Sequence, residues 1–197
     1  MRLRAVSSWV KVVVCLLAVA LLVAAPRASH AQIISPNLGV SLGARKNTAL
    51  TVSVLSGAVQ SIASITDGAI NAFSSAVRVQ TTWDVNPGLT GSVQLVAYFT
   101  DPTSALAAGP SARIASSRVQ GRMATGLPTA FTAFTGVGIG GVGTAGASLR
   151  LFSVNITGPN RNATRTDDLD LRLNLTGQAP LSVGTYTGMI YLRAVTM

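Results

Sequence analysis

Hydrophobic and polar residues alternate with a period of two in several stretches of this 197-residue chain. Side chains of a β-strand point alternately to the two faces of a sheet, so this pattern predicts strands with one buried face. The clearest stretch has leucine at every second position from residue 169 to residue 175. We expect Leu171 and Leu173 to lie in the core and Arg172 to face water. The other alternating stretches are residues 50–54, 77–83, 93–99 and 185–197.

Turn-forming residues separate these stretches, namely Asn86-Pro87-Gly88, Asp101-Pro102, Gly109-Pro110 and Gly158-Pro159-Asn160. Short alternating strands joined by such turns are typical of an antiparallel sandwich or barrel. No apolar stretch repeats convincingly at helical spacing, although residues 65–73 and 104–108 could each form a helical turn. We therefore predict an all-β, antiparallel sandwich as a single domain over residues 50–197.

The N-terminus has the layout of a secretory signal peptide. Three basic residues precede an uncharged apolar run over residues 12–25, and Pro26 follows it. Small residues, Ser29 and Ala31, then precede Gln32, which predicts cleavage between Ala31 and Gln32. The apolar run is shorter than the ~20 residues that span a bilayer. We expect a signal peptide over residues 1–31, secretion to the periplasm, cell surface or medium, and no membrane anchor after cleavage.

A loose arm follows the cleavage site over residues 32–49, because it contains Pro36 and several glycines. Leu38, Val40 and Leu42 alternate with small residues, so the arm could pair as a strand. It could add an edge strand to its own domain, stay unpaired, or complete the sandwich of a neighbouring copy. The simplest expectation is one of the first two.

Composition excludes several kinds of catalytic site. The chain has no Glu, and its single Cys and single His, Cys15 and His30, both lie within the predicted signal peptide. Once the signal peptide is removed, the mature chain has no His and no Cys. This excludes a Ser-His-Asp triad, a cysteine nucleophile and a zinc site with His or Cys ligands. The scarcity of Glu and Lys also argues against a helical protein. We expect no enzymatic activity, no cofactor and no metal.

Six aspartates remain as candidates for acid chemistry. A glycosidase needs two carboxyl groups across a cleft, but Asp84 and Asp101 both lie in turn sequences, where Asp caps its own backbone. Asp167, Asp168 and Asp170 form the one acidic cluster, and oxygen ligands would suit calcium. Alternation places Asp168 and Asp170 on the face opposite the leucines, so we interpret them as part of a solvated strand face.

Glycine-rich and basic segments raise the question of nucleotide and nucleic-acid binding. Residues 136–146 contain G-x-G-x-x-G, but a strand over residues 147–154 follows where the dinucleotide fingerprint requires a helix, so we interpret the segment as a flexible loop. After residue 31 the chain has eleven basic residues against six acidic ones, and the basic residues are dispersed. Only Arg113, Arg118 and Arg122 are loosely grouped, without interleaved aromatic residues. We expect no nucleic-acid partner, and we keep an anionic surface glycan as an alternative partner.

The segment 181–188 (LSVGTYTG) resembles the last hairpin of secreted spore-coat-U and chaperone–usher pilin domains. Further shared features resemble a group of small exported bacterial proteins of unassigned activity: Trp83 before Asn86-Pro87-Gly88, the strand over residues 93–99, Asn160-Arg161, residues 165–167 and the ending over residues 184–196. The resemblance implies an immunoglobulin-like sandwich. We expect structural roles for Trp83, for Gly184 in a tight turn, and for Tyr186, whose ring can be buried while its hydroxyl bonds nearby backbone.

Together these features predict an exported, non-enzymatic structural or adhesive protein of the cell surface, associated with a pilus or matrix. Its expected partners are further copies of itself or a surface glycan. Two alternatives stay open. A carbohydrate-binding module would display aromatic residues on one face, with Tyr98, Tyr191 and Phe152 as candidates, and a hydrolase would have to use Asp alone.

Overall fold

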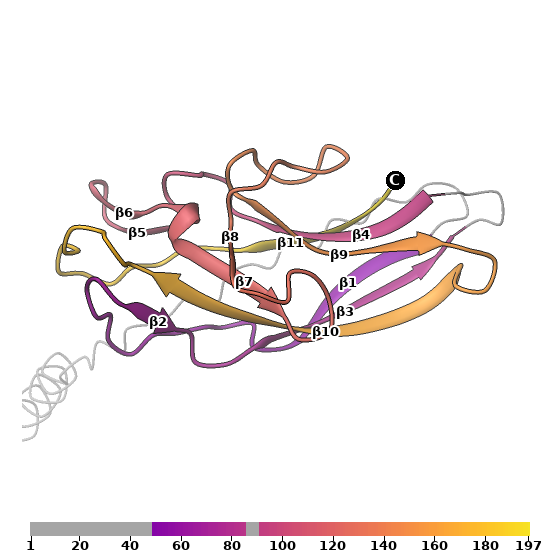
Figure 1. Ribbon diagram of the computed structural model, residues 1–197, viewed down its shortest axis with the longest axis horizontal. Coiled ribbons are helices and arrows are strands. Elements are labelled where there is room, and N and C mark those ends of the chain that lie inside the picture. Colours follow the sequence, from indigo (N-terminus) through magenta and orange to yellow (C-terminus); the bar gives the residue numbers. More distant parts are fainter. Residues whose placement is uncertain (1–48, 86–90) are drawn as a thin grey trace, which may run out of the picture. The chain divides into compact units, whose positions relative to one another are not determined.

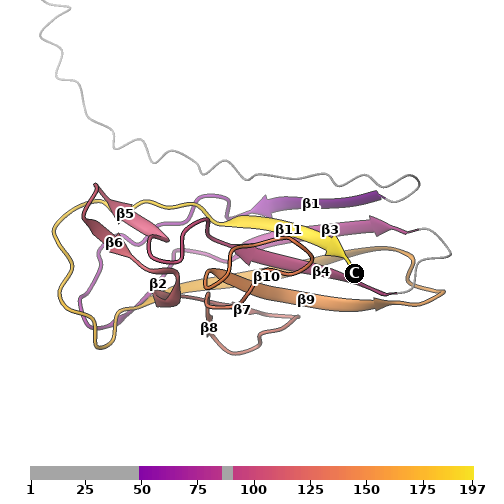
Figure 2. The ribbon, with the colours of Figure 1, turned by 90° about the horizontal axis from the view of Figure 1, so that it is seen from above.

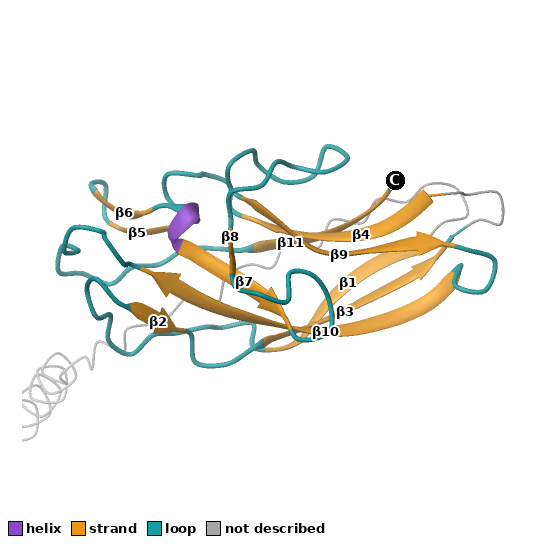
Figure 3. Ribbon diagram, viewed as in Figure 1, coloured by secondary structure: helices purple, strands orange, loops and turns teal. Residues whose placement is uncertain are grey.

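The computed structural model describes residues 49–85 and 91–197. Within these ranges, one short 3₁₀-helix accompanies eleven β-strands, and all strand pairs are antiparallel (Figure 3). The prediction of an all-β, antiparallel fold is therefore confirmed. The signal peptide, the Asn86-Pro87-Gly88 turn and all of the arm except Ala49 lie outside the described residues. No helix of the described part of the chain is long and apolar enough to cross a membrane.

The larger sheet contains six strands. Five of them follow one another across the sheet: β1 (Ala49–Ser56), β3 (Val77–Asp84), β10 (Asn162–Asn174), β7 (Val119–Met123) and β8 (Thr132–Ala133). The short β2 (Ile70–Ala72) pairs with the C-terminal end of β10. The long β10 therefore holds this sheet together, because β2, β3 and β7 all pair with it.

The smaller sheet contains β11 (Tyr191–Thr196), β4 (Gly91–Tyr98) and β9 (Ser148–Ile156), with β4 in the centre. In Figure 1 it forms a layer above β1, β3 and β10. A hairpin of β5 (Leu106–Ala108) and β6 (Ala112–Ile114) and the 3₁₀-helix (Ser116–Arg118) connect β4 to β7. The chain thus passes repeatedly from one sheet to the other.

The core lies between the two sheets. The indole of Trp83 on β3 lies 6.4 Å from the ring of Phe152 on β9, and Phe99 meets Phe134 edge to face at 5.1 Å. Leu171 and Leu173 on β10 are buried, at 6% and 1% exposure. The alternating leucines therefore supply one wall of the core, and burial of their apolar surface stabilises the fold.

Two short elements correct the sequence analysis. Residues 104–108 and 65–73 do not form helical turns, because they contain β5 and β2. Pairing with a neighbouring strand overrides the local preference in both cases: β5 pairs with β6 across a turn in which Gly109 has a φ of +82°. The last strand is also shorter than predicted, since β11 covers only Tyr191–Thr196 of the stretch 185–197.

Each sheet has a free edge on the same side of the domain. Within the described residues, β1 pairs only with β3, and β11 pairs only with β4. These two strands contact each other, and Figure 2 shows them side by side. On this side the described part of the domain therefore ends in two strands that each have one described partner.

The register of β11 shows which of its backbone groups face the free edge. Ser92 and Met197 exchange two backbone hydrogen bonds of 2.9 Å, and the register continues without a shift along β11. Hydrogen-bonded pairs alternate with non-hydrogen-bonded pairs in an antiparallel ladder. The N–H and C=O groups of Leu192, Ala194 and Thr196 consequently point away from β4, toward the free edge.

Candidate functional site

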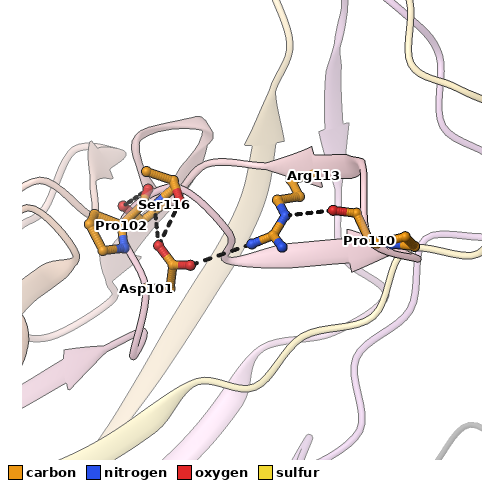
Figure 4. Close-up of polar contacts among 6 residues, drawn as sticks. Asp101, Pro102, Pro110, Arg113 and Ser116 are labelled. Atoms are coloured by element: carbon orange, nitrogen blue, oxygen red, sulfur yellow. Dashed lines mark hydrogen bonds and ion pairs between the residues drawn. The ribbon is translucent and has the colours of Figure 1, made fainter.

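Asp101 lies in the turn that follows β4. Its carboxylate accepts hydrogen bonds of 2.7 Å from both the backbone N–H and the hydroxyl of Thr103. Arg113 lies 3.6 Å away on β6, and Ser116 donates to the Pro102 carbonyl beside this turn (Figure 4). The Thr103 hydrogen bonds and, to a smaller extent, Arg113 lower the pKa of the exposed Asp101 carboxyl. The carboxylate thus fixes the connection between β4 and β5.

The acidic cluster of β10 is divided between the two faces of its sheet. Asp168 and Asp170 point outward, where Asp168 lies 3.9 Å from Arg78 and Asp170 pairs with Arg122 at 2.9 Å. Asp167 points inward and is buried. Three carboxylates on opposite faces of one sheet cannot converge on one cation, and no group of three His, Cys, Asp or Glu residues in the described ranges could hold a metal ion.

Asp167 belongs to an inner polar cluster that the sequence analysis did not identify. Arg165, two residues before it, donates to both carboxylate oxygens, at 2.6 Å from Nε and 2.7 Å from Nη2. Thr125 donates to the same carboxylate at 2.6 Å and accepts a hydrogen bond from Arg165 through its backbone oxygen. The guanidinium also covers the ring of Phe152, with 4.9 Å to its centroid. This cluster ties the segment after β7 to β10.

The outer face of the six-stranded sheet carries a ladder of polar and charged side chains. Thr82 and Thr164 share a hydrogen bond of 3.0 Å across β3 and β10. Arg122 and Arg172 both lie over the ring of Phe131, at 4.6 Å and 4.0 Å. Both guanidinium groups therefore interact with a side chain of the same face, which is consistent with a solvated surface.

The sequence-predicted structural residues lie in the core and beside β5. Trp83 is 3% exposed, and its indole N–H donates to the Asn160 carbonyl at 2.8 Å. Tyr186 packs against the core, and its hydroxyl donates to the Ser182 carbonyl at 3.0 Å. Gly184 lies in a bend without a left-handed φ, and a β-carbon there would come within 2.9 Å of Ala108. Close packing against β5, rather than backbone conformation, therefore requires glycine at this position.

The aromatic candidates for carbohydrate binding are separated by the fold. Phe152 is buried and faces the core, so it cannot meet a ligand on the surface. Tyr98 and Tyr191 are opposite each other on β4 and β11, with their rings stacked at 5.5 Å and 24°. Their neighbours Ala97 and Leu192 are buried in the core. The tyrosine pair therefore lies on the outer face of the three-stranded sheet.

The glycine-rich segment forms a hydrogen-bonded hairpin rather than an open loop. Ile139 and Val142 exchange backbone hydrogen bonds of 2.7 and 2.9 Å around Gly140 and Gly141, which have φ of +57° and +76°. Positive φ at both turn residues is the geometry of a tight two-residue hairpin. A β-carbon on Gly140 would lie within 3.0 Å of Val195, so the hairpin passes over the outer face of the small sheet.

Comparison with known proteins gives no match: no family model, no curated protein and no solved structure is similar enough to this chain to assign it.

Proposed function

We propose that the chain is an exported, non-enzymatic structural or adhesive protein of the cell surface, built as an immunoglobulin-like sandwich whose copies associate through an open sheet edge. The observation that carries this proposal is the free edge of β11 beside the free edge of β1. The engagement of Asp101, Asp167 and Asp170 in turns and ion pairs supports the non-enzymatic part.

Strand order supports the immunoglobulin-like part of the proposal. Such sandwiches have one sheet in the order A-B-E-D and a second sheet with strands C, F and G. Strands β1, β3, β10 and β7 follow one another as A, B, E and D would, and β4 and its neighbour β11 correspond to C and F. Strand β9 lies on the other side of β4 and has no counterpart among these seven strands. The place of strand G, beside F, is the free edge of β11. Among the described strands none occupies it.

An incomplete edge of this kind favours pairing with another strand. Unpaired N–H and C=O groups at a sheet edge are a template for a further strand, whose alternate side chains can fill pockets. Leu50, Val54 and Ala194 border the two free edges and are only partly buried against the core. A strand with apolar residues at alternate positions would cover them. Leu38, Val40 and Leu42 of the arm have that pattern.

Export is tested by the mature N-terminus. Mass spectrometry of the protein recovered from the cell envelope or medium should find Gln32 as the first residue. An intact chain beginning at Met1 in the membrane fraction would contradict the proposal.

Assembly is tested by deleting residues 32–45 from the exported protein and measuring its mass and thermal stability. We expect the complete protein to form oligomers and the shortened one to stay monomeric, with oligomers restored by adding intact subunits in excess. A monomer of unchanged stability would mean that the arm is unpaired, and a destabilised monomer that never forms oligomers would mean that the arm pairs within its own domain.

A further inference from the structure

The outer face of the three-stranded sheet combines the tyrosine pair with two arginines. Arg193 on β11 and Arg150 on β9 lie on either side of Val96 in the register of β4. Tyr191 and Tyr98 follow two positions away on the same face, about 7 Å along the strands. We call these four side chains, Tyr98, Tyr191, Arg150 and Arg193, the outer aromatic face.

The strands of this face carry arginines and no acidic residue. None of the six aspartates lies on β4, β9 or β11. Within the described residues, the four ion pairs join other arginines, and Arg150 and Arg193 have no hydrogen bond or ion pair through their side chains. The Cα atoms of Arg193 and Arg150 lie about 10 Å apart, the width of two strand spacings, and neither guanidinium group has a charged partner among the described residues.

The remainder of the face is closed, which limits where a ligand can contact it. The hairpin around Gly140 passes beside Val195 and Met197. Val96 is fully buried although it faces outward, and Gln94 is 92% buried with no partner for its Oε1. The same segment also bonds to Ser148, which is buried opposite Tyr98 in the register, so it crosses the face from Ser148 to Val195. Tyr98, Tyr191 and Arg193 lie together on one side of it, and both rings are partly exposed.

We propose that the outer aromatic face binds an acidic polysaccharide, one that carries carboxylate or sulfate groups. Aromatic rings offer flat apolar surfaces on which the C–H faces of sugar rings can pack, while their hydroxyl groups accept and donate hydrogen bonds. Guanidinium groups bind carboxylate and sulfate with paired, charge-assisted hydrogen bonds. The proposal rests on the proposed export of the chain, because a polysaccharide of this kind would be met outside the cell.

A single-stranded nucleic acid is the competing ligand with the same chemistry, since bases also stack on aromatic rings beside basic residues. Such binding uses a continuous positive groove with successive aromatic platforms. Here one stacked tyrosine pair and Arg193 make a small face bordered by the glycine-rich hairpin, which favours a sugar ligand.

The test is a binding titration of the full exported protein against polygalacturonate, heparin, dextran and single-stranded DNA at physiological ionic strength. We expect binding to at least one of the two acidic polysaccharides, weak or absent binding to neutral dextran, and weaker binding to DNA. Tyr191→Ala and Arg193→Gln should each weaken polysaccharide binding at least 10-fold, whereas Tyr191→Phe should retain most of it.

Two matched variants on the other sheet serve as controls. Arg78→Gln removes the same charge, and Phe131→Ala removes an aromatic ring, from the outer face of the six-stranded sheet. Neither should change the affinity. The proposal is overturned if neither acidic polysaccharide binds, if Arg78→Gln weakens binding as much as Arg193→Gln, or if DNA binds more tightly. Because this titration measures ligand binding and the arm deletion measures oligomer mass, the two proposals can fail separately.

Discussion

Arg165 and Asp167 are two residues apart on β10 and form a bidentate ion pair on the inner face of the six-stranded sheet, with distances of 2.6 and 2.7 Å. The Asp167 side chain is 2% exposed and that of Arg165 is 26% exposed. Removing one partner of a buried pair leaves the other charge unpaired in a medium of low dielectric constant. The pair therefore fixes how β10 and the segment after β7 meet.

Asp167→Asn should lower the free energy of unfolding by about 3 kcal/mol, because it leaves the Arg165 guanidinium without its counter-charge. The matched variant Asp168→Asn, on the solvated face one residue further, should cost less than about 1 kcal/mol. Urea denaturation of both variants checks this. Equal losses would mean that the inner cluster contributes no more than a surface ion pair.

Leu171→Ala should cost about 2–5 kcal/mol, because it leaves a cavity in the wall of the core. Arg172→Ala, on the opposite face, should cost at most about 1 kcal/mol, because it loses only its contacts with Gln120 and the Phe131 ring. A denaturant series on both variants measures the difference. A larger loss for Arg172→Ala would contradict the register of β10.

How far the sequence predicts this fold is visible along β10. The leucines have the period of a half-buried strand, so their burial follows from local pattern alone. Arg165 and Asp167 have the same period and also point inward, yet ionised residues are expected at the surface, and only their mutual pairing makes burial possible. Thr125, which bonds to both residues, lies 40 and 42 positions away in the chain and leaves no signal in the sequence of β10. The burial of Val96, which faces away from the core, also leaves no signal in the sequence of β4.

The sequence predicts which aromatic residues are candidates for the site, but it does not predict which of them lie next to each other. Tyr98 and Tyr191 stand out in the sequence as aromatic residues in strands, but 93 positions separate them, and their contact depends on the register of β11 against β4. Phe152 has the same pattern as a surface aromatic residue and is buried instead. A register shift on β9 between its pairings with Leu95 and Val96 places both Leu151 and Phe152 in the core.

Gly188→Ala should lower stability by about 1–3 kcal/mol, because a β-carbon there would overlap the Ala105 carbonyl oxygen. Gly158→Ala is the control, since nothing lies within 4 Å of that position and its φ is not in the left-handed region. Thermal unfolding of the two variants should separate them. A neutral Gly188→Ala would mean that the segment before β11 does not pack on β5.

The Asp101 carboxyl should titrate below its ordinary pKa of 3.8, because the hydrogen bonds from Thr103 favour its ionised form. A pKa that is lower in the folded chain than in the unfolded chain stabilises the fold above about pH 4, and this contribution is lost as the pH falls through the folded value. NMR titration checks the pKa directly. Thr103→Val should raise it, and Arg113→Gln should raise it by less; the reverse order would contradict the assigned cause.

The most direct test of an open edge on β11 is amide hydrogen exchange, followed residue by residue at low and high protein concentration. The amides of Arg193 and Val195 face β4 and should be protected at both concentrations. Those of Leu192 and Ala194 face the free edge, and we expect them to exchange rapidly in the monomer and slowly once copies associate. Rapid exchange of Leu192 and Ala194 in the oligomer, or protection of both in the monomer, would contradict assembly through this edge.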